Sequence, residues 1–134
     1  YISWMFKVQS NIENGTFRGI QLAAAEAYNT NTPEWYHKNN IENYGRRRVI
    51  AEKIMDVLGC HYDPKQVGMF LWGRIPDSYD DVEQLTEKVL HEARVFITPG
   101  FIFGKNGRRY IRISLCAKDE KMRTALDRIK KVFG

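Results

Sequence analysis

The stretch from Val95 to Leu115 constrains the fold of this chain more than any other part of the sequence. It opens with a short apolar run, which Pro99-Gly100 interrupts, and a loop with two further glycines follows. Apolar and polar residues then alternate, as they do in a β-strand that buries one face. The face expected to be buried carries Ile111, Ile113 and Leu115. The stretch therefore predicts a strand with a defined inner and outer face.

Arg112 falls on the outer face of this strand, together with Tyr110 and Ser114. An arginine in the middle of a β-prone segment is costly unless something pairs with it. One interpretation is an edge strand whose second face is solvated. The other is that a rigid strand holds Arg112 so that its planar guanidinium receives a carboxylate. The pattern alone leaves both interpretations open.

The same stretch resembles a known family. The residues that carry the resemblance are Pro99-Gly100, Phe103-Gly104, Gly107 and the strand from Tyr110 to Ser114. In this order and at this spacing they are similar to the C-terminal signature of class I/II aminotransferases, which are pyridoxal-phosphate enzymes of the aspartate aminotransferase type. The resemblance implies that Arg112 binds the α-carboxylate of the substrate. It also implies that Phe70 can line the site, although a core aromatic is the more common role for a residue in such a strand.

The N-terminal part of the chain predicts one element cut off upstream and one helix. Residues 1–9 are apolar without a helix start, and residues 10–15 form a turn-rich break. Thr16 is then expected to cap a helix that continues to Tyr28. Segments in this part also resemble the region that follows the large domain in the aminotransferase family.

A long helix is predicted from Thr32 to Leu58, because Thr32-Pro33-Glu34 is a helix start and Gly59 supplies a stop. Arg46-Arg47-Arg48 lies within it. Tyr44 with the last two arginines resembles a family pattern, but Val49 stands where an acid commonly follows. We expect the three arginines to form a solvated helix face, with a binding role as the alternative.

Four further elements complete the prediction. VGMFLW at residues 67–72 is typical of a strand buried on both faces. A helix is expected from Asp81 to His91, capped by Ser78 or Asp80, and the last helix from about Asp119 to Val132. Val95 to Ile97 is expected to form a short strand. These elements predict an α+β fold in which helices cover the apolar face of a small three-stranded sheet.

By its size, the chain is expected to form a single domain spanning residues 1–134, with residues 1–15 as the remnant of an upstream element and a turn. The resemblance implies the small-domain architecture of fold-type I aminotransferases. In that architecture the Arg112 face points toward a large domain upstream in the same chain. That large domain and a second copy of the protein are therefore the partners that the resemblance implies.

The resemblance also implies the chemistry. The complete enzyme would use pyridoxal phosphate to transfer an amino group between an amino acid and a 2-oxo acid, and Arg112 would bind the carboxylate. We expect the 134 residues alone to be inactive, to hold no catalytic residue and to bind no cofactor. Lys7 comes closest in sequence order to the cofactor lysine, but it lies after the expected position. The identity of that lysine and the substrate specificity therefore depend on residues outside this sequence.

Composition argues against several other classes. The net charge of +5 invites a nucleic-acid hypothesis, but acidic residues are mixed among the basic ones and no nucleic-acid motif is present. No apolar run approaches the ~20 residues that span a bilayer. Cys60 and Cys116 lack metal-site spacing, so no metal is expected, and two reduced thiols in a cytoplasmic protein are the better interpretation. A small α+β ligand-binding or regulatory module remains as the alternative function. In such a module Arg112 would pair within the domain, and the chain would bind a small acid unaided.

Overall fold

The computed structural model describes residues 1–13 and 15–134, and these fall into two compact units, Tyr1–Lys38 and Asn39–Gly134. The first unit holds helices α1 (Ile2–Ile12), α2 (Arg18–Thr30) and α3 (Pro33–Tyr36). None of these three helices has a buried residue. Whether residues 1–134 fold as one domain stays a prediction.

Two details of the first unit differ from the sequence prediction. Ser10 to Ile12, expected in a turn-rich break, belong to α1, and the predicted break also includes Asn14, which lies outside the described residues. The α2 helix begins at Arg18 after Phe17, and no side chain caps it, so Thr16 is not the cap. Backbone hydrogen bonds to Phe17 O start this helix instead. Thr32 does cap the next helix, since its Oγ1 accepts a hydrogen bond from Trp35 N at 3.2 Å.

The long helix is continuous but changes geometry. After α3, residues His37–Tyr44 form a π-helical segment, and α4 (Gly45–Val57) continues the helix as an ordinary α-helix that ends before Gly59. Three more elements follow: β1 (Phe70–Arg74), α5 (Val82–Ala93) and β2 (Thr98–Pro99). Two short 3-10 turns, η2 (Gly100–Phe103) and η3 (Lys105–Gly107), lead into β3 (Tyr110–Ser114) and α6 (Asp119–Phe133).

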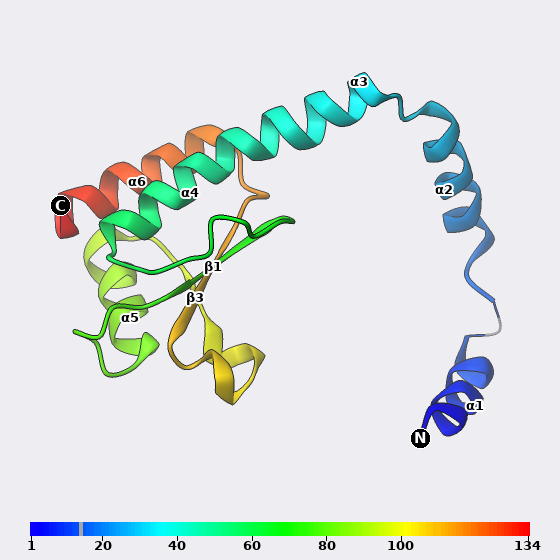
Figure 1. Ribbon diagram of the computed structural model, residues 1–134, viewed down its shortest axis with the longest axis horizontal. Helices are drawn as coiled ribbons and strands as arrows, with labels where there is room; N and C mark the ends of the chain where they lie inside the picture. The colour runs from blue at the N-terminus through cyan, green and yellow to red at the C-terminus, as the bar shows by residue number, and fades with distance from the viewer. Residues whose placement is uncertain (14) are drawn as a thin grey trace. The chain divides into compact units, whose positions relative to one another are not determined.

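The three strands form an antiparallel sheet in the order β1-β3-β2. The α+β prediction with helices on one face of a small sheet is confirmed. Helices α4 and α6 lie side by side and, with α5, cover the same face of the sheet (Figure 1). The central strand, β3, is the one that carries Arg112.

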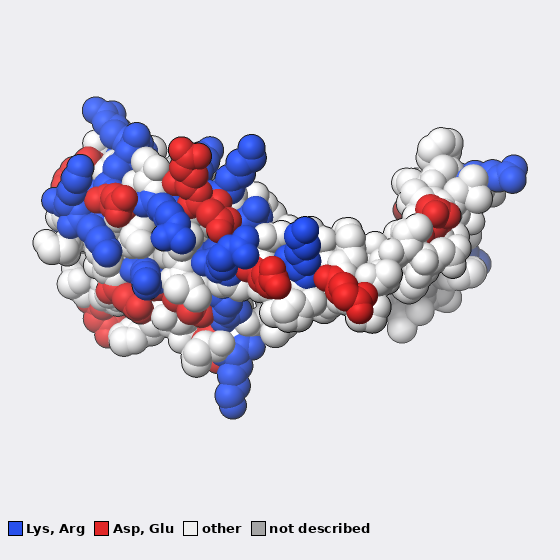
Figure 2. All heavy atoms as spheres, turned by 90° about the horizontal axis from the view of Figure 1, so that it is seen from above, with Lys and Arg blue, Asp and Glu red and all other residues white. Residues whose placement is uncertain are grey.

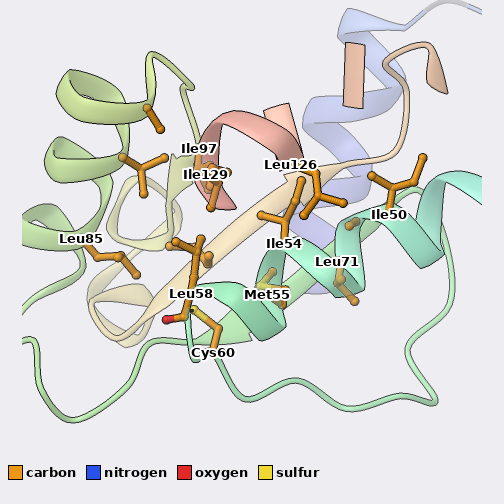
Figure 3. Close-up of a cluster of buried hydrophobic side chains, with 14 of the residues drawn as sticks. Ile50, Ile54, Met55, Leu58, Cys60, Leu71, Leu85, Ile97, Leu126 and Ile129 are labelled. Carbon is orange, nitrogen blue, oxygen red and sulfur yellow. Dashed lines mark hydrogen bonds between the residues drawn. The ribbon is translucent and has the colours of Figure 1, made fainter. Parts of the chain in front are cut away.

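The core lies between that face and the three helices (Figure 3). Leu71 and Ile111 reach it from neighbouring strands and are fully buried. The helices contribute an apolar stripe each, as their spacing predicts. These stripes include Ile50, Ile54 and Met55 from α4, Val82, Leu85 and Val89 from α5, and Met122, Leu126 and Ile129 from α6. The packed face fixes the register of β3, because a shift by one residue would send Arg112 into the core.

Both outer strands differ from their predicted positions. The first runs over Phe70–Arg74, and it buries only alternate residues rather than both faces. Strand β2 lies at Thr98–Pro99 instead of residues 95–97, because pairing with β3 begins only at Thr98. Pro99 is tolerated there because β2 is an edge strand. The cap of α5 is Asp81, whose Oδ1 accepts a hydrogen bond from Glu83 N at 2.9 Å, rather than Ser78 or Asp80.

Candidate functional site: an arginine between two phenylalanine rings

Strand β3 presents Arg112 on the face of the sheet opposite the helices, as predicted. Its neighbours in the strand, Ile111 on one side and Ile113 on the other, point toward the core or its margin. The pairing places Trp72 of β1 and Thr98 of β2 directly opposite Arg112. Because paired residues share a face, all three side chains start on the outer face of the sheet.

The guanidinium of Arg112 contacts two aromatic rings. Its Cζ is 4.2 Å from the centre of the Phe70 ring and 4.3 Å from the centre of the Phe103 ring. Both distances are within the range of a cation–π contact. Phe70 comes from the start of β1 and Phe103 from the end of η2. Phe70 is 37% exposed, so it is a surface residue beside Arg112 and not a core aromatic.

The hydrogen-bonding groups of Arg112 remain unused within the described chain. Its Nε is buried and has no hydrogen-bond partner, and it is the one such side-chain atom among the described residues. By contrast, Arg109 donates to Tyr79 O, to Asp80 O at 3.0 Å and to Pro76 O at 3.1 Å. A guanidinium carries five donors and stays charged. Arg112 therefore contacts two aromatic rings, while no described residue takes the hydrogen bond that its Nε could donate.

The glycines of the motif shape the loop that delivers Phe103. Gly100 and Gly107 lie against each other: a Cβ added to Gly100 would come within 2.5 Å of Gly107 O, and one added to Gly107 would collide with the backbone of Gly100. Only two residues without side chains permit this approach. The contact closes the loop between β2 and β3, and Phe103 is held where its ring reaches Arg112.

A groove of about 780 Å³ next to Arg112 is lined by residues 94–98, the end of β3 and helix α6. Its lining is mainly apolar and includes the charged residues Arg94, Lys118, Lys121, Arg128 and Glu120. Neither Phe70 nor Phe103 lines it. The groove is thus adjacent to the aromatic surroundings of the guanidinium but separate from them.

The arginine run of α4 is not the solvated face that the sequence predicts. The side chains of Arg47 and Arg48 are only 19% and 20% exposed. Arg47 donates to Asp119 Oδ1 at 3.0 Å and to Leu115 O at 3.2 Å, which connects α4 to the start of α6 and to the residue after β3. Arg48 binds Glu52 and the loop before β1. Hydrogen-bond acceptors on neighbouring elements draw both side chains inward, and only Arg46 is half exposed.

The hydrogen bond that Arg47 donates, opposed by desolvation, holds the pKa of Asp119 below its ordinary value, with Arg46 as a further cause. Basic and acidic side chains are interspersed on the face seen in Figure 2. Among residues 1–13 and 15–134, no cluster of three or more His, Cys, Asp or Glu side chains suits a metal ion. No helix of the described part is long and apolar enough to cross a membrane.

The cysteines take no part in this site. Both are free thiols, with Cys60 buried and Cys116 exposed. Burial raises the pKa of the Cys60 thiol to about 12.

Sequence reasoning named Arg112 and Phe70, and the structure brings these two together. It did not assign Phe103 or Trp72 to the site. Phe103 lies in a loop whose path no periodicity reveals. Trp72 shares a strand face with Phe70 at a spacing of two residues, and that spacing was the one available signal.

Comparisons with known proteins agree with this geometry. A family model described as aminotransferase class I and II matches residues 2–129. LL-diaminopimelate aminotransferase of Natranaerobius thermophilus is 32% identical over 134 residues, which is 99% of this chain and 34% of the relative. Transaminase BacF of Bacillus subtilis is 32% identical over 129 residues, covering 92% of this chain and 31% of the relative.

Solved structures give the same result. Apo-BacF from Bacillus subtilis aligns with a TM-score of 0.72 at 30% identity, over 99% of this chain and 34% of that chain. MJ0684 from Methanococcus jannaschii aligns with a TM-score of 0.78 at 28% identity, over 96% of this chain and 34% of that one. The chain spans about one third of the length of the curated relatives it matches. By the match over nearly its whole length, this chain belongs to the class I and II aminotransferase family.

Proposed function

We propose that the protein carrying this chain is a pyridoxal-phosphate-dependent aminotransferase, and that Arg112 binds the α-carboxylate of the amino acid and of the 2-oxo acid. Membership of the family supports the activity. The observation that supports the role of Arg112 is its guanidinium, which lies on the outer face of β3 without a hydrogen-bond acceptor in the described chain.

The chemistry of this arrangement suits a carboxylate. Two parallel N–H donors of a guanidinium match the two oxygens of a carboxylate, and such charge-assisted pairs are among the strong hydrogen bonds in proteins. The rings of Phe70 and Phe103 contact the guanidinium through their π faces and offer it no hydrogen-bond acceptor, so its donors are left for an anion. In this role Phe70 lines the approach to the carboxylate site. Arg112 would hold the same group in every substrate and would orient the α-carbon relative to it.

The described residues do not fit the cofactor. The aldehyde of the cofactor needs a lysine in an enclosed site, and all lysines of the described chain are exposed. We therefore assign the cofactor to the part of the protein that corresponds to the remaining two thirds of the relatives, and we derive no step through it. A large domain of the same polypeptide and a second copy of the protein are proposed as partners. Placement in the cytoplasm stays a prediction.

The test is Arg112→Lys in the complete protein, with Arg108→Lys as the control, since Arg108 is an exposed arginine in the same part of the chain. Lysine keeps the charge but loses the paired donors. We expect kcat/KM to fall at least about tenfold for both an acidic and an apolar amino acid, because the α-carboxylate is common to the two; a charged hydrogen bond of about 1.5–3 kcal/mol predicts a loss of this size. Arg108→Lys should leave both values unchanged.

An unchanged kcat/KM for Arg112→Lys with both substrates would remove Arg112 from the substrate site. A loss of thermal stability with unchanged kinetics would assign the arginine a structural role. If the 134 residues alone bound a small carboxylic acid tightly, the ligand-binding module would be the better description.

A further inference from the structure

The two rings that enclose the guanidinium of Arg112 are supported unequally. Phe70 is the first residue of β1, whereas Phe103 projects from a loop and is 50% exposed. The Phe103 ring also contacts the indole of Trp72, with the ring centres 5.3 Å apart and the planes at 69°. This edge-to-face geometry is the preferred one for aromatic pairs. The Phe103 ring therefore contacts both Trp72 and Arg112, which are paired across β1 and β3.

Trp72 is itself fixed through its backbone. Its N–H donates to Gln66 Oε1 at 2.9 Å, and its carbonyl accepts from Gln66 Nε2 at 2.8 Å. The edge of β1 that faces away from β3 is the outer edge of the sheet. One side-chain amide thus takes the place that a further strand would occupy, and it satisfies both backbone groups of Trp72.

Gln66 is anchored in turn by helix α4. Its carbonyl accepts a hydrogen bond from Arg48 Nη1, and Pro64 O accepts one from Arg48 Nη2 at 3.0 Å. Glu52, one turn further along α4, pairs with Arg48 Nε at 2.8 Å. Each nitrogen of the Arg48 guanidinium therefore donates to an acceptor, unlike the Nε of Arg112. A continuous series of contacts leads from the core helix to the exposed loop.

We propose that Trp72 is a positioning residue for Arg112: it holds the Phe103 ring against the guanidinium, and the Gln66 side chain fixes Trp72 for this purpose. The claim that the rings order Arg112 follows from the geometry alone. The claim that this order favours carboxylate binding rests on the proposed function. A long side chain on the outer face of a sheet loses much rotamer freedom when it binds an anion. Rings that hold it beforehand reduce that cost, so the carboxylate meets an arginine already in place.

The order of Arg112 can be measured directly through the 15N relaxation of its Nε–Hε group in the 134-residue chain. We expect an order parameter close to that of rigid backbone, about 0.85, in the unaltered chain. Phe103→Leu should lower it to below about 0.6, and Trp72→Leu should lower it by a smaller amount. The control is Phe133→Leu, which removes a different cation–π contact, that of Lys88 at 5.0 Å, and should change nothing at Arg112.

The double variant tests whether Trp72 acts through Phe103. If it does, Trp72→Leu has no further effect on Arg112 once Phe103 is leucine. Gln66→Met, which removes both hydrogen bonds to Trp72 while keeping a long side chain, should lower the order parameter in the same direction. Gln66→Met therefore tests the role of Trp72 even if the Trp72→Leu variant fails to fold. Two results would overturn the proposal. One is an Arg112 order parameter that stays at the value of the unaltered chain in both Phe103→Leu and Gln66→Met. The other is a Trp72→Leu substitution that lowers the order parameter as much in the Phe103→Leu background as it does alone.

Kinetics of the complete protein separate this proposal from the proposed function. We expect Trp72→Leu to raise KM about threefold to tenfold for both an acidic and an apolar amino acid and to change kcat less, because the α-carboxylate is shared. If Arg112→Lys leaves the kinetics unchanged while Trp72→Leu still loosens Arg112, the proposed function fails and the positioning stands. If Arg112→Lys is impaired while the relaxation of Arg112 is insensitive to Trp72, Phe103 and Gln66, the positioning fails and the function stands.

Discussion

The helices of the two units are stabilised in different ways. In Asn39–Gly134, the helices α4, α5 and α6 bury a stripe each against the sheet. In the described residues of Tyr1–Lys38, no side chain is buried, and Trp4 and Phe6 are 69% and 73% exposed. Helices of 11 and 13 residues are marginal in water when only their own hydrogen bonds support them. The comparison teaches that the second unit carries its own stability, while the first depends on local structure and on whatever covers its apolar side chains.

The largest expected difference in the free energy of unfolding is between two leucine substitutions, one in each unit. Leu71 is fully buried, whereas Leu22 of α2 is 59% exposed. Leu71→Ala should lower the free energy of unfolding by about 2–5 kcal/mol, since it leaves a cavity between β1 and the helices. Leu22→Ala should stay within about 0.5 kcal/mol. Denaturant unfolding followed by circular dichroism measures both. Equal losses would show that α2 belongs to the same core.

The next pair uses glycines and predicts opposite signs. A Cβ on Gly107 would meet the backbone of Gly100, so Gly107→Ala should cost about 1–3 kcal/mol and shift the Phe103 loop. A Cβ on Gly19 would meet only the exposed Phe17 ring, at 2.6 Å from Cε1, and that side chain can move away. Gly19→Ala should therefore favour α2 by up to about 1 kcal/mol, seen as increased helicity. A destabilising Gly19→Ala would contradict the view that α2 rests on local propensity.

Self-association tests what covers the first unit. Tyr1, Ile2, Trp4, Met5 and Phe6 are all more than two-thirds exposed. Exposed apolar side chains gathered on one short helix tend to find a partner, and identical surfaces pair most simply about a two-fold axis. We expect the 134-residue chain to dimerise, and Trp4→Ser or Phe6→Ser to raise the dissociation constant at least about tenfold, or 1.4 kcal/mol. Sedimentation over a concentration series measures this. A chain that is monomeric at high concentration would refute the idea, as would a dimer that both substitutions leave unchanged.

The parts of the fold that the sequence predicted are those set by periodicity. The alternation around Arg112 correctly assigned the inner and outer faces of β3, and the stripe of α6 placed that helix within one residue of its observed end. The stop at Gly59 was likewise correct. Each of these features depends on residues close together in the chain, so local pattern is sufficient to find it.

The failures have a common physical origin in long-range pairing. Residues 67–69 are apolar, but Gly68 has a φ of +92° and the strand begins only where it can pair with β3. Residues 95–97 are equally strand-like, yet the pairing with β3 begins at Thr98. The inward turn of Arg47 depends on Asp119, which lies 72 residues away. In the same way, the contact of Trp72 with Phe103 depends on a loop closed by Gly100 and Gly107, and no local pattern encodes it.

The smallest expected effects concern the pKa values of two carboxyl groups, one in each unit. The pKa of Asp119 is held below its ordinary value by hydrogen bonds that cross between elements, chiefly from Arg47. The pKa of Glu34 is also lowered, first by a backbone hydrogen bond at the start of α3 and then by Thr32. Arg47 lies 72 residues from Asp119, whereas everything that lowers the pKa of Glu34 lies within the same helical turn.

In both cases the folded-state pKa lies below the unfolded one, so the carboxylate favours the folded form above its ordinary pKa, and this contribution is lost as the pH falls through the folded value. Carbon-13 titration of the two carboxyl groups by NMR should show a reciprocal pattern. Arg47→Met should raise the pKa of Asp119 and leave Glu34 unchanged, while Thr32→Ala should do the reverse. At a denaturant concentration that unfolds Asn39–Gly134, Asp119 should return to its ordinary pKa, whereas Glu34 should keep its shift for as long as the Thr32 turn persists. If Glu34 and Asp119 lost their shifts together along the same unfolding curve, the two units would be one cooperative structure, and the division on which this comparison rests would be wrong.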